Sequence, residues 1–140
     1  MERLTKVMDK YLKKAVADWD KKVLTLTIDK QWFDMVVSGE KKEEYRVIKE
    51  YWVKRIIDVR KLHRGTAYIL RCLKGNDPML KNDIILQLGI PYTHVLFING
   101  YRKDSPRIEK EIESITIGKP KKGLCPEKWL DTEFFIIKFK

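Results

Sequence analysis

Residues 26–46 read LTIDKQWFDMVVSGEKKEEYR, and the pattern of side chains changes twice within this stretch. The β-branched and apolar run over residues 22–28 predicts a strand. Asp29 can then cap a short helix, because a carboxylate accepts hydrogen bonds from backbone N–H groups two or three residues on. Gly39 is typical of the position after a helix, since glycine enters the left-handed region without a Cβ penalty. The buried side of this helix is expected to hold Trp32, Phe33, Val36 and Val37.

The charged run after Gly39 has two interpretations. It is either an edge strand whose charges discourage pairing with other chains, or one wall of a ligand site. Composition by itself favours the edge strand. In a strand, alternate residues lie on opposite faces. That alternation places Lys41, Glu43 and Tyr45 on one side and Lys42, Glu44 and Arg46 on the other.

The length and charge of the chain restrict what it can be. At 140 residues it has the size of one domain, and its 44% hydrophobic content is that of a globular protein. The formal net charge is +10, with +6 in residues 1–64 (17 basic, 11 acidic) and +4 in residues 65–140 (13 basic, 9 acidic). No basic tail therefore accounts for the total. A sequence pI near 9.6 is typical of proteins that bind nucleic acid.

Metal, cofactor and membrane functions have little support. Cys72, Cys125, His63 and His94 are isolated and match no metal-ligand spacing, so we expect neither a metal nor a cofactor. No run of about 18 apolar residues is present, and we expect no membrane association. The N-terminus lacks the apolar core of a signal peptide. We therefore expect a cytoplasmic protein with reduced thiols.

Residues 2–19 predict an amphipathic helix with one apolar stripe and a lysine-rich opposite face. Such a helix either packs on its own domain or docks on a partner, and a protein partner is the alternative that we keep. The stripe consists of Leu4, Val7, Met8, Tyr11, Leu12, Ala15, Val16 and Trp19.

The remainder of the chain predicts short strands, turns and one more helix. A helix is expected over residues 49–58, with Tyr51, Trp52 and Ile56 on its core side. Residues 107–117 are ambiguous, and their second half favours a strand. Strands are expected at 67–73, 83–88, 93–98 and 133–140, turns at 74–78, 89–91 and 99–100, and a loop at 119–126. The pattern predicts a small α+β barrel forming a single domain over residues 1–140.

Two further segments combine features that suit nucleic acid. Asn99 and Gly100 indicate a tight turn. The alternative is a site in which Tyr101 stacks on a base and Arg102 or Lys103 holds phosphate. The loop lysines, at positions 119, 121 and 122, are either solvated or extend the same footprint.

Residues 26–46 resemble the signature of the ASCH domain family, a branch of the PUA-like superfamily. The family pattern is an apolar strand, a short helix with an aromatic residue, and then Gly-Glu-Lys-x-x-Glu-x-Arg. In this chain the last part of the pattern is formed by Gly39, Glu40, Lys41, Glu44 and Arg46. The segment VLFINGYRKDSP (95–106) resembles one found in a phage-related subset, and EFFIIKFK (133–140) resembles the last strand of the family.

The resemblance covers about residues 23–140 and implies a PUA-like β-barrel with flanking short helices, preceded by an extra helix over residues 1–20. It places Lys41, Glu44 and Arg46 beside a cleft that binds RNA or a modified nucleoside. There Glu44 would accept from an exocyclic amine and Arg46 would donate to a carbonyl. We expect the turn residues Asn99, Tyr101 and Arg102 to belong to the same ligand-binding set.

The resemblance also leaves an enzyme open. Some family members are amidohydrolases acting on acylated cytidine, and one is a reported ribonuclease. In the amidohydrolases a threonine three residues after the lysine is the nucleophile, and Glu44 stands at that position here. A carboxylate cannot supply the same activated hydroxyl. The catalytic candidates are therefore Lys41 and Glu44, with Glu44 as a general base in a hydrolase of a different mechanism.

Overall fold

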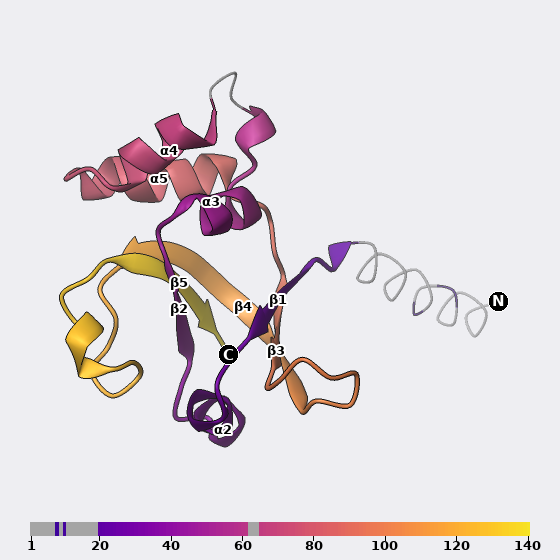
Figure 1. Ribbon diagram of the computed structural model, residues 1–140. Coiled ribbons are helices and arrows are strands. Elements are labelled where there is room, and N and C mark those ends of the chain that lie inside the picture. Colours follow the sequence, from indigo (N-terminus) through magenta and orange to yellow (C-terminus); the bar gives the residue numbers. More distant parts are fainter. Residues whose placement is uncertain (1–7, 9, 11–19, 62–64) are drawn as a thin grey trace.

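The computed structural model describes residues 8, 10, 20–61 and 65–140 of the chain (Figure 1). The predicted helix over residues 2–19, and with it the choice between packing and docking, lies outside these residues apart from positions 8 and 10. Within the described ranges, no helix combines the length and apolar character that crossing a bilayer requires. The same residues contain no group of three or more His, Cys, Asp or Glu side chains able to hold a metal ion.

A five-stranded mixed sheet forms the centre of the fold. Its strands lie in the order β1 (Val23–Thr27), β3 (His94–Ile98), β4 (Arg107–Gly118), β5 (Phe134–Phe139) and β2 (Glu43–Val47). The first pair, β1 and β3, is parallel, and the other three pairs are antiparallel. The long strand β4 pairs with β3 through its first half and with β5 through its second, with a register shift between Ile112 and Ser114.

The two ends of the sheet are not joined by strand pairing. β1 and β2 are its edges, and helix α2 (Lys30–Ser38) connects them in sequence. The contact between the edges is made by a side chain, because Nη2 of Arg46 in β2 donates to the carbonyl of Thr27 in β1 over 3.0 Å. The α+β class that the sequence predicts is confirmed, whereas the described strands form an open sheet and do not show a closed barrel.

The helices lie in two groups (Figure 1). α3 (Glu50–Ile56), α4 (Thr66–Leu73) and α5 (Pro78–Leu88) gather at one end of the sheet, and α2 lies at the opposite end. Two single turns of 3-10 helix, η1 (Val59–Lys61) and η2 (Glu127–Trp129), complete the described elements. The group formed by α3, α4 and α5 covers one hydrophobic core, and α2 covers the other.

Strand β5 connects the two cores. Phe135, Ile137 and Phe139 share one face of the strand, because side chains alternate along it. Phe135 belongs to the core under α3, α4 and α5, whereas Ile137 and Phe139 belong to the core under α2. All three side chains are at most 1% exposed, so the two groups of helices are held on one continuous sheet.

Two predicted strands are wrong. Residues 67–73 form helix α4, and residues 83–88 are the second half of helix α5. In α4 the buried residues Ile69 and Leu73 are four apart, which is a helical spacing. Helix α5 begins at a cap in which Asp77 Oδ1 accepts from the N–H groups of Met79 and Leu80. The short apolar runs of these segments fit a buried strand as well as a helix, so their sequence did not separate the two.

The rest of the local pattern is largely confirmed, with smaller corrections. β1, β3, β5 and α3 lie where the sequence predicts them, and Gly39 ends α2 with a φ of 88°. β4 is a strand over its whole length, not only its second half. Val37 and Tyr51 are about half exposed and lie outside the core. Asp29 stands at the N-cap of α2, but its side chain makes no capping hydrogen bond.

Candidate functional site

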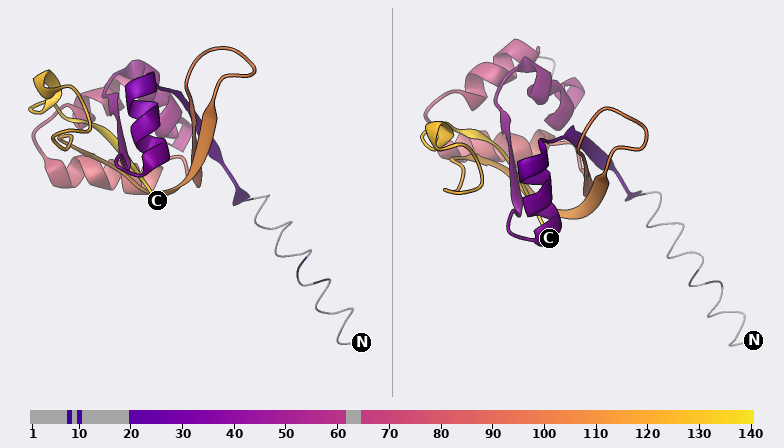
Figure 2. Two further views of the ribbon diagram at one scale, coloured as in Figure 1. Left: turned by 90° about the horizontal axis from the view of Figure 1, so that it is seen from below. Right: turned by 60° about the horizontal axis from the view of Figure 1, so that its bottom comes forward.

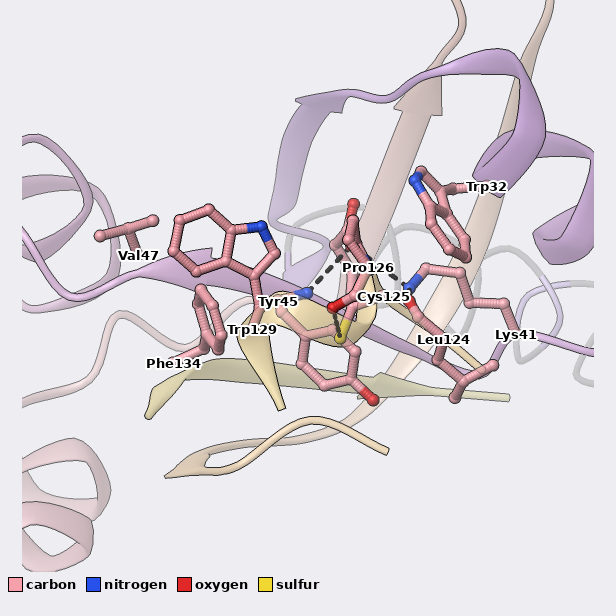
Figure 3. Close-up of a pocket in the computed structure, with 10 residues that line it drawn as sticks. Trp32, Lys41, Tyr45, Val47, Leu124, Cys125, Pro126, Trp129 and Phe134 are labelled. Atoms are coloured by element: carbon pink, nitrogen blue, oxygen red, sulfur yellow. Dashed lines mark hydrogen bonds and ion pairs between the residues drawn. The ribbon is translucent and has the colours of Figure 1, made fainter. Parts of the chain in front are cut away.

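A pocket of about 280 Å³ lies between α2, β2 and the β4–β5 loop, residues 119–133 (Figure 3). It contains two of the predicted site residues, Lys41 and Glu44. Most of the remaining wall is aromatic or apolar. The pocket is lined by Trp32, Lys41, Glu44, Tyr45, Val47, Leu124, Cys125, Pro126, Trp129 and Phe134.

The turn after α2 puts Lys41 into this pocket. With Gly39 in the left-handed region, the chain reverses, and the N–H of Lys41 donates to the carbonyl of Met35 over 3.0 Å. Lys41 is 1% exposed although it carries a charge. It precedes the first residue of β2, Glu43, so the strand alternation that groups Lys41 with Glu43 and Tyr45 does not apply to it.

The ammonium of Lys41 is surrounded by acceptors and rings. Its Nζ donates to the carbonyl of Leu124 and lies 3.5 Å from Glu44 Oε1. It is also 5.3 Å from the centre of the Trp32 ring and 4.8 Å from that of Tyr45, at distances typical of cation–π contacts. Burial lowers the pKa of Lys41, and the neighbouring Glu44 carboxylate acts in the opposite direction.

Glu44 lies between two cations. Its Oε1 faces Lys41 and accepts from the N–H of Tyr45 over 3.0 Å, and its Oε2 accepts from Arg46 Nη2 over 2.9 Å. An ionised carboxylate offers about four acceptor positions. Glu44 thus retains limited capacity for a ligand, and much of its role is to neutralise its neighbours.

Arg46 does not line the pocket. It lies behind Glu44, where its guanidinium bridges Glu44 and the carbonyl of Thr27 and stands 5.1 Å from the centre of the Trp52 ring. Its Nε is buried without a hydrogen-bond partner among the described residues. This placement differs from the direct base contact that the sequence predicts. The reason is that Arg46 points toward β1 across the open side of the sheet.

Trp129 and Phe134 form a wall that the sequence does not indicate. Their rings are edge-on, with 6.4 Å between centres, and Phe134 also lies 6.2 Å from Tyr45. Trp129 is 43% exposed at the mouth of the pocket. A tryptophan in a polar Pro/Gly-containing loop is the one signal that could have drawn attention to it.

Tyr45 fastens the β4–β5 loop against β2. Its hydroxyl donates to Glu43 Oε2 over 2.8 Å and accepts from the N–H of Lys121 over 3.0 Å. Lys121 Nζ forms an ion pair with Glu43 Oε1 at 3.4 Å. Burial raises the pKa of Tyr45, so the hydroxyl stays protonated and can serve as both donor and acceptor. The three predicted loop lysines are all exposed and none lines the pocket, but Lys121 ties the loop to β2 through Tyr45 and Glu43.

Cys125 places a thiol on the same wall. Burial raises the pKa of this thiol, and the nearby Lys41 acts against that shift. The thiolate is the reactive form of cysteine, so burial keeps Cys125 weakly nucleophilic. Its contribution to the pocket is a soft apolar surface.

The other predicted site residues lie elsewhere. Tyr101 and Arg102 are on the β3–β4 loop, residues 99–106, and neither lines the pocket. The two views of Figure 2 place α2 between this loop and η2. The amide of Asn99 donates to the carbonyl of Ile28 over 2.9 Å, so it supports the end of β1. The structure thus brings Lys41, Glu44 and Arg46 together and places Asn99 on the carbonyl next to the one that Arg46 contacts. Tyr101 and Arg102 lie apart from this group on the exposed loop.

Comparison with known proteins gives no relative from which to transfer a function. No protein-family model, curated protein or solved structure matches the chain. The chemistry of the pocket and of the exposed loop therefore carries the functional interpretation.

Proposed function

We propose that the protein binds a nucleobase, within RNA or as a modified nucleoside, in the pocket between α2, β2 and the β4–β5 loop. The observation that carries this proposal is the ring of aromatic side chains around the buried pair of Lys41 and Glu44. A volume of about 280 Å³ lies at the lower end of the range for ligand pockets, about 300–1,000 Å³, and suits a single ring system.

The chemistry of the lining matches that of a base. Trp32, Tyr45 and Trp129 offer flat apolar faces, and stacking of a base on such a ring contributes about 1–3 kcal/mol. Lys41 is a donor, and Glu44 is an acceptor with some capacity left, so the polar edge of a base finds both. The net charge of +10 favours a ligand that carries phosphate.

We also propose that the chain is a member of the ASCH family with a PUA-like fold, in its phage-related subset. The strand, helix, turn and strand that follow one another through β1, α2 and β2 support this proposal. So does the position of Lys41 and Glu44 beside the pocket. In this proposal the five-stranded sheet is an open form of the PUA-like barrel, and Arg46 links its edges.

Isothermal titration calorimetry with a panel of unmodified, methylated and acylated nucleosides, and with short RNA, tests the base pocket. We expect Trp129→Ala to weaken binding about 5- to 150-fold, the equivalent of about 1–3 kcal/mol of stacking. Tyr51→Ala is the matched control, because Tyr51 is about as exposed as Trp129 but lies outside the pocket. Absence of binding across the whole panel, or equal losses in both variants, would contradict the proposal.

The second candidate function is hydrolysis of a modified nucleoside or of RNA. It is favoured by Lys41, whose pKa is lowered by burial and which faces Glu44 inside the pocket, an arrangement common at catalytic sites. Mass spectrometry of the nucleoside panel and of RNA before and after incubation separates the two functions. Hydrolysis predicts a product that disappears with Lys41→Met, whereas binding alone predicts unchanged compounds at high protein concentration.

A further inference from the structure

The β3–β4 loop presents one aromatic ring to solvent. Tyr101 is 94% exposed, more than any other large apolar or aromatic side chain among the described residues. No hydrogen bond, ion pair or ring contact involves it in that part of the chain. The ring therefore contributes nothing to the core, and packing does not explain why an aromatic side chain stands at this position.

The backbone that carries Tyr101 is well supported. The N–H of Asn99 donates to the carbonyl of Pro106, and Arg102 and Ser105 exchange two hydrogen bonds of 2.9 and 3.1 Å. Gly100 has a φ of 124°, and a Cβ at this position would lie 2.7 Å from Ser105 Oγ. The loop conformation is thus held by its own hydrogen bonds and by the backbone turn at Gly100, and the loop presents the Tyr101 ring to solvent.

Positive charge surrounds the ring. The side chains of Arg102 and Lys103 are exposed and have no partner within the described residues. Arg107, at the foot of the loop, donates to the carbonyls of Ser105 and Lys103, which leaves its charge without a carboxylate. Three cations against the single carboxylate of Asp104 give residues 99–107 a formal charge of +2.

The adjoining surface of β4 differs, because its carboxylates are paired with lysines. Glu109 pairs with Lys21 at 2.9 Å, and Glu111 pairs with Lys140 at 3.0 Å. An exposed ring flanked by unpaired cations is therefore a property of the loop and not of the whole strand pair.

We propose that the β3–β4 loop is a second contact for a single-stranded polynucleotide. Tyr101 stacks on a base outside the pocket, and Arg102 and Lys103 hold the neighbouring phosphates. Proteins usually bind single-stranded nucleic acid with aromatic rings and cations, because every base has a face that can stack and every nucleotide carries a phosphate. The inference deepens the proposed function, on which it rests for its ligand class, by making the ligand an oligonucleotide and not a free nucleoside.

The loop and the pocket are connected through the junction between β1 and α2. Asn99 anchors the loop on the carbonyl of Ile28, the residue before Asp29 at the start of α2. The same helix carries Trp32 to the pocket. Both contacts are thus attached to the junction between β1 and α2, and α2 lies between the β3–β4 loop and η2 (Figure 2).

Fluorescence anisotropy with a labelled single-stranded RNA of about 12 nucleotides, within the usual site sizes for single strands, tests this inference. DNA of the same sequence is the second probe. We expect Tyr101→Ala to weaken binding about 5- to 150-fold. Arg102→Ala with Lys103→Ala should reduce the slope of log K against log salt by about 1.4, or about 0.7 for each lost phosphate contact. None of these variants should change the affinity for a free nucleoside.

The matched control is Arg71→Ala with Lys74→Ala. Both residues are exposed cations, and they lie in and after α4, at the other end of the sheet from the loop (Figure 1). This control removes the same net charge and should leave the salt slope nearly unchanged. An equal loss in the control would overturn the inference, because it would show a general charge effect.

The result for the loop can be separated from that for the pocket. If Trp129→Ala abolishes oligonucleotide binding while the three loop substitutions leave it at the wild-type level, the inference is overturned and the proposed function stands. If the loop substitutions weaken oligonucleotide binding and no nucleoside binds the pocket, the loop contact is supported and the proposed function fails. Binding of both RNA and DNA supports stacking and phosphate contacts, and preference for RNA adds a contact to the 2′-hydroxyl.

Discussion

Arg46 and Asn99 donate to consecutive carbonyls at the end of β1. Nη2 of Arg46 reaches Thr27 over 3.0 Å, and Nδ2 of Asn99 reaches Ile28 over 2.9 Å. The sequence predicts both residues as ligand contacts, but in the structure both side chains hold the junction between β1 and α2. They thereby position the candidate sites without lining the pocket.

Asn99→Ala should lower the free energy of unfolding by about 1–2 kcal/mol, because the buried carbonyl of Ile28 loses its side-chain donor. Asn99→Asp should be no better, since an ionised carboxylate is an acceptor only. Urea denaturation measures the change. Asn76→Ala, in the exposed turn before α5, is the control and should stay within about 0.5 kcal/mol of the wild type. If the two alanine variants were equally stable, the anchoring role of Asn99 would be wrong.

Lys41 should make stability depend on pH in the alkaline range. Burial lowers the pKa of Lys41 in the folded protein below the ordinary value of 10.5. Between the lowered pKa and 10.5, the unfolded chain therefore binds more protons than the folded one. The contribution of Lys41 to the free energy of unfolding therefore rises with pH through this interval.

Lys41→Met removes this dependence. The difference in stability between wild type and Lys41→Met, measured by urea denaturation at several pH values from 7 to about 10, should grow in favour of the wild type as the pH rises. Lys54→Met is the control, because Lys54 is an exposed lysine on α3. A difference that shrinks with rising pH would show that the pKa of Lys41 is not lowered.

Tyr45→Phe should loosen the β4–β5 loop. The substitution removes the hydroxyl that accepts from the N–H of Lys121 and donates to Glu43, and the cost should be about 1–2 kcal/mol. Hydrogen exchange should become faster at the Lys121 amide. Tyr92→Phe is the control, because its hydroxyl donates to the backbone carbonyl of Arg55 in α3 and not to the β4–β5 loop. Unchanged protection of Lys121 in Tyr45→Phe would mean that the hydroxyl does not hold the wall of the pocket.

The ion pair between the buried Lys81 of α5 and the partly exposed Glu133 should respond asymmetrically to substitution. Nζ of Lys81 lies 2.6 Å from Glu133 Oε2, and the two side chains are 6% and 39% exposed. Glu133→Gln leaves a buried ammonium without its carboxylate and should cost about 2–3 kcal/mol. Lys81→Met removes the charge and leaves Glu133 partly in water, so the cost should stay below about 1 kcal/mol. Thermal or urea unfolding of both variants gives the order, and the reverse order would contradict the burial of Lys81.

Much of the path from β1 to β2 could be predicted because its signals are local. The β-branched and apolar content of residues 22–28, the helical spacing of Phe33 and Val36, and Gly39 in the left-handed region are each properties of a short stretch of sequence. The prediction failed at α4 and α5, where short apolar runs fit either a strand or a helix. The cap formed by Asp77 before Pro78 was the available signal for α5, since this pair is typical of a helix start.

The sequence by itself determined that a helix ends at Gly39 and that a charged strand with Glu44 and Arg46 follows it. Strand alternation would place Lys41 and Glu44 on opposite faces, and the two side chains meet because Lys41 lies in the turn before β2. Only the tertiary structure decided what surrounds them. Trp129 comes from the β4–β5 loop and Phe134 from the start of β5, about ninety residues further along the chain. Both reach the pocket because β5 pairs with β2 and carries that loop alongside. Tertiary structure also turned Arg46 toward β1, since the position of its guanidinium depends on how the edges of the sheet meet. The order of residues along the chain determines which side chains belong to one element, but strand pairing across the sheet determines which elements share a cavity.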